Sequence, residues 1–544
     1  MPRGRYPRLA MLNGLRGKWR RRGSCGVSRT VAACCVGALV LVPACGDASR
    51  GQPDLIVVSI DTLRPDALGA YGDASARTLH IDALAEAGVR FDQATTPFPR
   101  TTPALATLMT GLWPQHHGSR EVWDQVQRGT FLAELLRARG YFTVGVSGNA
   151  AASAHQGFAR GFDRFLSRAL PKQKRAGAVS RRALALVREA PADRPLFLWV
   201  HYLDPHFPYD APQAETEPAL GSKCRELYPL DRGDTYANRD DKSARALEDC
   251  WELYRAEITY TDEALGRLWA GLQEADRLGD AIVVLTSDHG EHMGERGIFY
   301  NHGPSVGDPS MRVPLIVKGS GITRGHVDRG IARLEDLAPT LLSLLGVPKE
   351  DWPQMDGVDL SARLLLDAPP EQVSQPALAY VESGSALKLR NFNAIVSGNK
   401  DERHCTNGPR FSLCHPEPGA PARLYDRSQD PELVHDVSAG HPAVVERLAA
   451  LERRWAPEEP RQRAVRSLDF KLVDIPVPEG GYRRELYDLR SDPRETVDVS
   501  ASHPQELARL GTALDGWTAT LPDYSPPARS DEDLEALREL GYVR

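Results

Sequence analysis

Residues 54–66 read DLIVVSIDTLRPD, in which an apolar run ends in a cluster of polar residues. A short, continuous run rich in β-branched residues is typical of a parallel strand buried on both faces. Similar runs follow at 142–147, 196–202, 281–287 and 313–319. Amphipathic helices are expected between these runs, at 82–87, 130–139 and 254–272. This alternation predicts an α/β fold, in which helices sandwich a large mixed or parallel sheet.

Polar side chains follow two of the predicted strands directly. Asp61 comes after the first strand, and Asp288 and His289 come after the strand at 281–287. Active sites form at the carboxyl ends of parallel strands, so these residues are expected to meet there and hold a divalent cation. Mostly oxygen ligands with one imidazole suit Ca²⁺, Mg²⁺ or Mn²⁺ better than Zn²⁺.

Thr101 lies in the segment TTPFPRTTPALATLMTGLWPQHHG at 95–118, two residues before Pro103. Proline favours the first turn of a helix, and a helix N-terminus favours negative charge. Cation coordination at such a place makes a threonine hydroxyl a usable nucleophile, so Thr101 is predicted to be both nucleophile and metal ligand. The alternative is that Thr101 and Thr102 only cap the helix, as threonine commonly does.

The chain resembles the sulfatases, within the alkaline phosphatase superfamily, over residues 54–366 and more weakly beyond. The segment at 95–118 carries the resemblance together with eight others that occur in the family order: IDTLRPDALGAYG, TLHIDALAEAGVRFDQA, GFARGFDRF, LFLWVHYLDPHFPY, TSDHGEHMGERG, MRVPLIV, LEDLAPTLLSLLGVP and LYDLRSDPRE. The resemblance implies an alkaline phosphatase-like α/β fold, one divalent cation and hydrolysis of sulfate or phosphate esters. It implies the metal ligands named above and adds three catalytic candidates: His206, near the bound sulfate, His302, as the proton donor to the leaving group, and His201, lining the pocket.

Several positions depart from the family pattern. Thr101 stands where sulfatases have the cysteine or serine that becomes formylglycine, and Thr62 stands where a second acid is usual. Ser147-Gly148-Asn149 replaces a lysine–histidine pair, which makes Asn149 a candidate for substrate binding. Leu105 replaces the arginine that would orient the sulfate.

Two other arginines are candidates for the missing cation. Arg64 lies close to Asp61 in the sequence, and Arg100 immediately precedes the threonine nucleophile. We therefore consider both as substrate-binding residues.

Thr101 changes the expected reaction, because a threonine ester cannot expel sulfate by collapsing to an aldehyde. Water must attack the covalent intermediate directly, or another acceptor must take the group. The first hypothesis is a metal-dependent hydrolase of sulfate esters that also accepts phosphate esters. The alternatives are a phosphodiesterase, phosphonate hydrolase or phosphoryl transferase on the same fold, and a catalytically inactive protein that binds anionic glycans.

An internal repeat follows the catalytic region. Residues 424–438 read LYDRSQDPELVHDVS and residues 486–500 read LYDLRSDPRETVDVS. We predict a duplicated strand–loop–strand–helix unit, at about 391–455 and 469–517, within a smaller C-terminal α+β domain. The predicted division of the chain is 1–45 as export signal, 54–375 as catalytic domain, 376–520 as C-terminal domain and 521–544 as tail.

The first 45 residues have the character of an export signal. Nine Lys or Arg and no acid precede an apolar stretch, TVAACCVGALVLVPAC at 30–45. The ending Val-Pro-Ala-Cys resembles a lipoprotein cleavage site, with Cys45 as the lipidated residue; the alternative is an ordinary signal peptide cut nearby. Either way the chain is expected to be exported to the periplasm or cell envelope, and with a lipidated Cys45 the lipid anchor is its only membrane attachment.

Loss of that segment makes the chain markedly acidic. The formal net charge is −6, and removing nine positive charges brings it to about −15. Such a protein is a poor partner for nucleic acid, so the expected partner is a small-molecule or glycan ester.

Four cysteines remain after Cys45. An even number in an exported chain is typical of disulfides. Of the three possible arrangements we favour the local pairs Cys224–Cys250 and Cys405–Cys414.

We predict that the mature chain begins at a lipid-modified Cys45. A basic segment followed by an apolar run that ends in Val-Pro-Ala-Cys is the pattern that favours this processing. Mass spectrometry of the mature N-terminus checks it. An unmodified N-terminus at any other residue would contradict the prediction.

Overall fold

The structure, a computed structural model, describes most of the chain after residue 50. The described residues are 51–122, 124–167, 175–207, 209, 241–295, 298–303, 305–365, 376–383, 404–407, 411–415, 422–426, 435–446, 461–477 and 481–522. All of them belong to the compact unit Ser49–Arg544. Cys45 and Cys224 lie outside them, as does the start of the first predicted repeat unit, residues 391–403.

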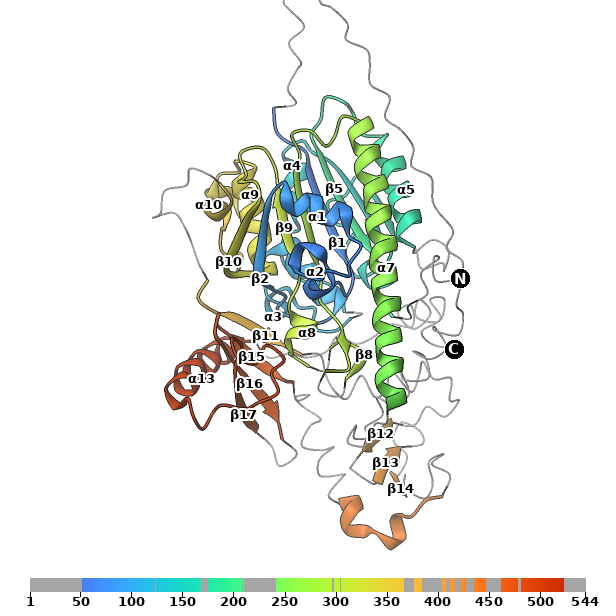
Figure 1. The fold of residues 1–544 in the computed structure, drawn as a ribbon, viewed down its shortest axis with the longest axis vertical. Coiled ribbons are helices and arrows are strands. Elements are labelled where there is room, and N and C mark those ends of the chain that lie inside the picture. Colours follow the sequence, from blue (N-terminus) through green and yellow to red (C-terminus); the bar gives the residue numbers. More distant parts are fainter. Residues whose placement is uncertain are drawn as a thin grey trace, which may run out of the picture. The chain divides into compact units, whose positions relative to one another are not determined.

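The centre of the molecule is an eight-stranded sheet (Figure 1). In spatial order its strands are β10 (His326–Arg333), β2 (Val89–Thr95), β9 (Leu315–Lys318), β6 (Ile282–Ser287), β1 (Leu55–Ile60), β5 (Leu196–Tyr202), β3 (Phe142–Ser147) and β4 (Arg164–Ser167). All five apolar runs are strands of this sheet, as predicted. β9 is antiparallel to both β6 and β2, so the sheet is mixed. An apolar run reports burial on both faces and does not specify strand direction.

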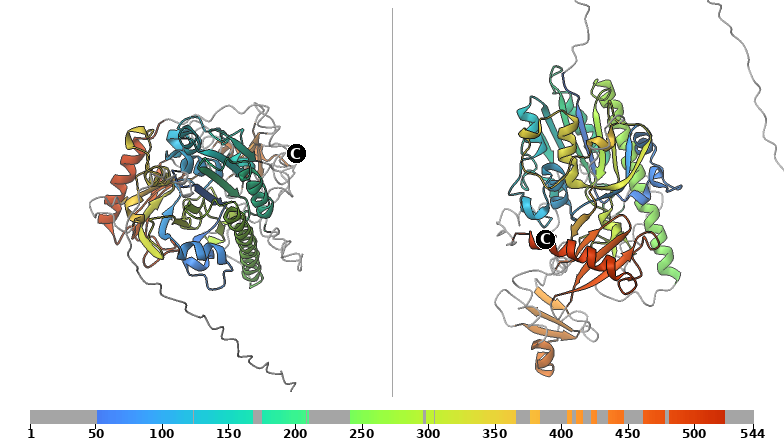
Figure 2. Two further views of the ribbon diagram at one scale, coloured as in Figure 1. Left: turned by 90° about the horizontal axis from the view of Figure 1, so that it is seen from above. Right: turned by 90° about the vertical axis from the view of Figure 1, so that its left-hand side faces the viewer.

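Helices cover both faces of the sheet, as the views in Figure 2 show. Ile56, Val58 and Ile60 pack on one side, while Leu55 and Val57 pack on the other. The helices of the first side are α1 (Leu79–Glu86), α5 (Ala176–Val187) and α7 (Asp241–Glu274). Those of the second side are α2 (Thr101–Thr110), α4 (Leu132–Ala138) and α9 (Leu337–Leu344). The alternation of side chains along β1 thus joins two apolar cores through one strand.

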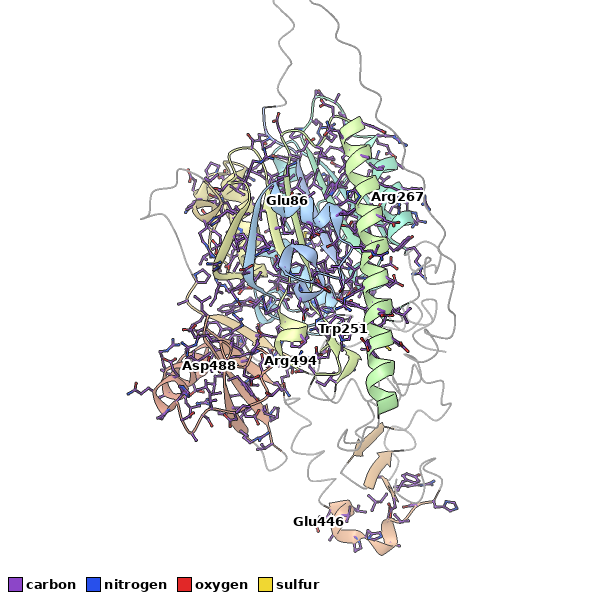
Figure 3. All side chains as sticks on the ribbon, in the orientation of Figure 1. Glu86, Trp251, Arg267, Glu446, Asp488 and Arg494 are labelled. Carbon is purple, nitrogen blue, oxygen red and sulfur yellow. The ribbon has the colours of Figure 1, made fainter. Side chains whose placement is uncertain are left out.

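The long helix α7 carries Trp251 and Arg267, both labelled in Figure 3. Despite its 34 residues it is too polar to be a membrane span, and no other helix within the described ranges meets the requirement either. The remaining short elements are α3 (Pro114–His117), α8 (Asp308–Met311), α10 (Ser361–Leu364), β7 (His292–Met293) and β8 (Phe299–Asn301).

A second, antiparallel sheet follows in the chain. It consists of β11 (Ala379–Glu382), β15 (Arg463–Arg466), β16 (Phe470–Pro476) and β17 (Tyr482–Asp488). Helix α13 (Pro504–Ala519) packs on it through Leu510, Leu514 and Trp517. A separate three-stranded sheet contains β12 (His404–Asn407), β13 (Phe411–His415) and β14 (Arg423–Asp426).

The two repeated sequences make the same hydrogen bonds. The carboxylate of Asp436 accepts from the amide of Leu424 at 3.2 Å, and Asp498 accepts from the amide of Leu486 at 3.0 Å. Each aspartate also accepts from the amide of the serine two residues later. The repeat is therefore a repeat of local structure as well as of sequence, although its strands, β14 and β17, belong to different sheets.

Three of the four cysteines expected in disulfides lie within the described residues: Cys250, Cys405 and Cys414. Cys250 on α7 is disulfide-bonded. Cys405 and Cys414 stand opposite each other as register partners of β12 and β13. Direct cross-strand neighbours are within the reach of a disulfide, so the register is compatible with the local pair that we favour.

Buried charges connect the antiparallel sheet to helix α8. Lys471 on β16 is 1% exposed and donates to Asp308 on α8 at 2.8 Å and to Glu495 at 2.7 Å. Arg466 also reaches Asp308, at 3.4 Å. Although burial opposes ionisation, Lys471 and Arg466 hold the pKa of Asp308 far below its usual range. Two buried carboxylates thus share one ammonium group, and Asp308 also faces Arg466.

We predict that Lys471→Met destabilises the protein, because it leaves Asp308 and Glu495 buried without their shared cation. Breaking such a buried arrangement costs about 3–5 kcal/mol. Denaturant unfolding measures the loss. Lys349→Met is the matched control, since the Lys349 side chain is 74% exposed and its loss should change the free energy of unfolding by less than about 0.5 kcal/mol. Equal stability of the two variants would contradict the prediction.

Candidate active site

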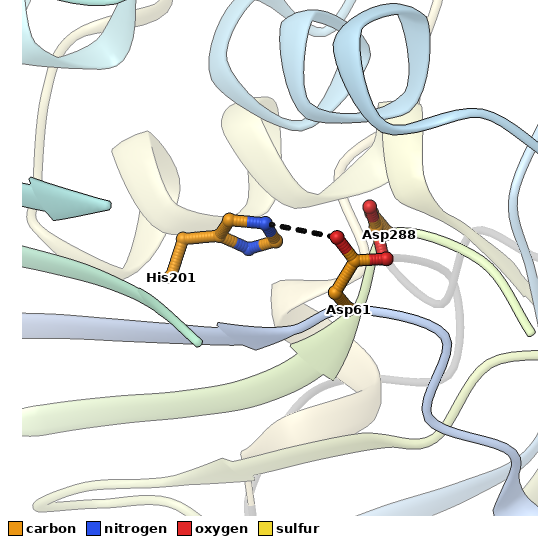
Figure 4. A group of neighbouring side chains, drawn as sticks. All are labelled: Asp61, His201 and Asp288. Atoms are coloured by element: carbon orange, nitrogen blue, oxygen red, sulfur yellow. Dashed lines mark ion pairs between the residues drawn. The ribbon is translucent and has the colours of Figure 1, made fainter. Parts of the chain in front are cut away.

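Three acidic and imidazole side chains meet at the carboxyl edge of the large sheet. Asp61 follows β1, Asp288 follows β6, and His201 lies near the end of β5 (Figure 4). β1 is parallel to both neighbours, and Ile60 pairs with Tyr202 on one side and Ser287 on the other. This register brings one ligand atom from each of the three buried residues within 4.8 Å of the others.

The three side chains fit a bound cation. Asp61 Oδ1, Asp288 Oδ2 and His201 Nε2 are buried and have no hydrogen-bond partner within the described part of the chain. Burial, and then the charge of Asp61, raises the pKa of Asp288. Burial would also raise the pKa of Asp61, but contact with His201 and the nearby charges of His206 and His289 outweigh it and lower the pKa. A divalent cation would give each of these three atoms a partner and would offset the negative charge of the two carboxylates.

Neighbouring groups hold these ligands in place. Ser59 Oγ is 2.9 Å from His201 Nδ1, which leaves Nε2 facing Asp61 Oδ2 at 3.7 Å. The Asn149 amide donates to Asp61 Oδ2 and accepts from the backbone of Ala151 at 2.8 Å. Asn149, predicted to bind substrate, is thus engaged in orienting a carboxylate, a role that commonly tunes metal ligands.

His289 also faces this cluster. Its Nε2 lies 3.4 Å from Asp288 Oδ2 and 3.8 Å from Asp61 Oδ1. Its Nδ1 is 3.0 Å from the carbonyl oxygen of Gly290. That contact fixes the tautomer with the proton on Nδ1 and leaves a lone pair on Nε2.

Thr101 is the first residue of α2, and its hydroxyl points to the same cluster. Thr101 Oγ1 is 3.5 Å from His289 Nε2. The helix has Arg100 at its N-cap and no side-chain cap, while the Thr102 hydroxyl donates to the carbonyl oxygens of Ala151, at 2.7 Å, and Val122. The alternative that these threonines cap the helix is therefore wrong.

Two further histidines line the site. The ring of His302 lies 4.2 Å from that of His289 and 5.2 Å from that of His206. His302 Nδ1 is 2.8 Å from Glu291 Oε1, and the Tyr209 hydroxyl donates to Glu291 Oε2 at 2.9 Å. Neither Glu291 nor Tyr209 was among the predicted site residues, although Glu291 belongs to the Asp-His-Gly-Glu segment. Burial, and then the positive neighbours, hold the pKa of His302 well below its ordinary value.

The two candidate arginines differ in their surroundings. The Arg64 guanidinium donates to Asp66 at 2.7 Å and Glu295 at 2.8 Å and stacks on Trp251 at 4.7 Å. Arg100 is buried beside Thr101, and its nearest carboxylate oxygen, in Glu121, is 3.8 Å away. Arg64 is therefore already hydrogen-bonded to two carboxylates, whereas Arg100 has no hydrogen-bonded carboxylate among the described residues and is the better candidate to bind an anionic ligand.

Comparison with known proteins identifies the family of the chain. Residues 53–347 match the family model described as Sulfatase. An ulvan-active sulfatase from Formosa agariphila is 30% identical over 396 residues, which cover 66% of this chain and 74% of that protein. The chain belongs to the sulfatase family. It is a hydrolase of that family, as the resemblance in its sequence implied.

Solved structures share the sulfatase fold. A protein in complex with its substrate D-glucosamine-2-N,6-O-disulfate has a TM-score of 0.61 and 18% identity, covering 88% of this chain and 100% of its own. The phosphonate monoester hydrolase of Agrobacterium radiobacter has a TM-score of 0.59 and 21% identity, covering 86% and 95%. The alkaline phosphatase-like fold class is confirmed.

We predict that Asp61→Ala and Asp288→Ala lose the binding of Mn²⁺. Each change removes a carboxylate from a site whose unpaired atoms fit a cation. Titration calorimetry measures the affinity. Thermal unfolding measures the stabilisation, which is about 2.7 kcal/mol for a ligand present at a hundred times its Kd. Glu86→Ala, exposed on α1 (Figure 3), is the control and should bind Mn²⁺ like the wild type. Undiminished Mn²⁺ binding in both site variants would place the cation elsewhere.

Proposed function

We propose that this sulfatase-family enzyme hydrolyses sulfate esters of small molecules or glycans, with Thr101 as its nucleophile. The observation that carries the proposal is the position of the Thr101 hydroxyl, at the N-terminus of α2 and 3.5 Å from His289 Nε2. The hydroxyl makes no cap, so it is available for attack. A sulfated glycan as substrate is supported by the similar protein solved with a disulfated glucosamine.

The first half of the reaction transfers the sulfuryl group to Thr101. Asp61, Asp288, His201 and His289 would hold the cation, which would stabilise negative charge on the transferred group. The α2 N-terminus favours the same charge. The Thr101 hydroxyl, made more acidic by a bound cation, gives its proton to solvent, and Oγ forms a bond to sulfur while the bond from sulfur to the ester oxygen breaks. His302 is fixed on Glu291 through Nδ1, and burial and its positive neighbours lower its pKa. The negative charge of the bound ester opposes those neighbours, so in the complex Nε2 takes up a proton and passes it to the departing oxygen.

The second half must return Thr101 to its free form. Thr101 carries a sulfate ester at this stage and has no hydroxyl through which to expel it. Water therefore attacks the sulfur directly, and the Thr101 oxygen leaves with a proton. His206 lies beside His302 and can orient the water that attacks.

The chemistry of threonine also favours a second candidate, hydrolysis of phosphate diesters or phosphonate monoesters. These reactions need no aldehyde, and a threonine phosphoester is resolved by direct attack of water. The likeness to a phosphonate monoester hydrolase supports only that the fold can accommodate such substrates. A protein that binds anionic glycans without turnover would keep the cation and hydrolyse none of these esters.

We predict that Thr101→Ala abolishes turnover while Mn²⁺ binding stays within about threefold of the wild type. Loss of a nucleophile typically lowers kcat by several orders of magnitude. Thr101→Ser keeps a hydroxyl and should retain measurable activity. Thr101→Cys should act as a sulfatase only where a formylglycine-generating enzyme recognises the segment. A fully active Thr101→Ala would exclude Thr101 as the nucleophile.

We predict that kcat/KM for an aryl phosphate diester rivals or exceeds that for the matched aryl sulfate, because Thr101 cannot release sulfate through an aldehyde. Assays of both esters with one leaving group measure the ratio. A preference for sulfate above about a hundredfold, roughly 2.7 kcal/mol of transition-state discrimination, would show that the leaving chemistry at Thr101 does not set specificity.

A further inference from the structure

Arg100 is a buried cation with little compensation. The residue is 9% exposed, and its Nε has no hydrogen-bond partner in the described ranges. Its closest carboxylate oxygen, in Glu121, stands 3.8 Å from Nε, beyond hydrogen-bond distance. A buried charge without a hydrogen-bonded partner is unfavourable, so binding of an anion would stabilise this guanidinium.

Glu121 is occupied by another arginine. Arg461, which precedes β15, is 3% exposed and donates from Nη2 to Glu121 Oε1 at 2.8 Å. Arg461 also donates from Nη1 to the carbonyl oxygen of Ser383 at 3.1 Å. Arg461 therefore shares the charge of Glu121, whose other oxygen, Oε2, is the one that lies 3.8 Å from Arg100 Nε.

Arg100 lies beside the reacting groups. Thr101 follows it directly, and its guanidinium packs against Gly303, the neighbour of His302. A Cβ added to Gly303 would stand 2.6 Å from Arg100 Cζ, and Gly303 has a φ of +104° that few other residues adopt. Glycine at this position thus makes room for the guanidinium between the α2 N-terminus and His302.

Position 105, where the family has an arginine, cannot supply a cation for the anion in this chain. Leu105 is fully buried among the apolar residues between α2 and the sheet. Arg64 already donates to Asp66 and Glu295. Of positions 64, 100 and 105, only position 100 therefore has an arginine that is not already paired by a hydrogen bond with a carboxylate of the described chain.

We propose that Arg100 binds the anionic group of the substrate through its guanidinium, and that Arg461 is a positioning residue that keeps Glu121 from pairing with Arg100. The anion is the sulfuryl or phosphoryl group transferred to Thr101, and this identity rests on the proposed function. The helix N-terminus and the guanidinium then face the same group from two sides.

Inorganic sulfate, the expected product, is the probe, and titration calorimetry of the Mn²⁺-loaded protein measures its affinity. Arg100→Gln should weaken sulfate binding by about tenfold to a hundredfold, as charge-assisted hydrogen bonds require, and leave Mn²⁺ affinity unchanged. Arg100→Lys should recover part of the loss. Arg139→Gln, at the opposite edge of the sheet and paired with Asp351, is the control with wild-type affinity.

Arg461→Met tests the positioning role. It should weaken sulfate binding by a similar factor, because Glu121 is then free to pair with Arg100. Glu121→Gln alone, and Glu121→Gln combined with Arg461→Met, should bind sulfate at least as well as the wild type. A merely structural role of Arg461 would leave the double variant as impaired as the single one.

Two outcomes overturn the proposal: wild-type sulfate affinity in Arg100→Gln, or failure of the double variant to recover binding. If Arg461→Met does not fold, Glu121→Gln still decides the point, since a loss of sulfate affinity there would make Glu121 a support for the site rather than a competitor. Wild-type protein that binds sulfate through Arg100 but hydrolyses no ester would reject the proposed function while leaving the anion site in place.

Discussion

The parallel pairing of β1 with β5 and β6 is the constraint on which the site depends. It places two buried carboxylates, from Asp61 and Asp288, at the same height on one edge of the sheet, with His201 beside them. Such an arrangement is unfavourable by itself, because like charges in a buried place repel and lose their hydration. The fold accepts this cost where a cation can offset it, and the surrounding hydrogen bonds keep the carboxylates from relaxing apart.

The C-terminal sheet also contacts the catalytic region through buried charges. Glu382 on β11 is fully buried and receives hydrogen bonds from Arg120, just after α3, and from Arg463 on β15. Although burial opposes ionisation, Arg120 and the arginines of the sheet lower the pKa of Glu382 to about 2. With the Arg461–Glu121 pair and the Lys471 cluster, buried ionic contacts connect the C-terminal sheet and its flanking Arg461 to the catalytic region, a first set near the nucleophile helix and a second at α8. The second matters to the site because Ser310 of α8 accepts from the amide of Gly290, next to His289.

The sequence predicts the central strands well because continuous apolar runs report burial directly. It misses β2, β4 and β10, whose faces are partly exposed and whose sequences mix polar with apolar residues. The site residues that follow a strand, such as Asp61 and Asp288, are predictable from position. The pairing of His302 with Glu291 and the difference between Arg64 and Arg100 are not, since they depend on which carboxylates lie beside each side chain in the folded chain.

The departures at positions 101 and 105 are related through helix geometry. Residues four apart lie on one face of a helix, so an arginine at 105 would project beside the side chain at 101. In this chain that face is apolar after the first turn, with Leu105 and Leu108 in the core against the sheet. Positive charge for the site must then come from before the helix, where Arg100 stands outside the apolar face and next to the first amides of α2. A nucleophile at the first helical position and a cation at the N-cap thus form a site that needs no charged residue farther along the helix.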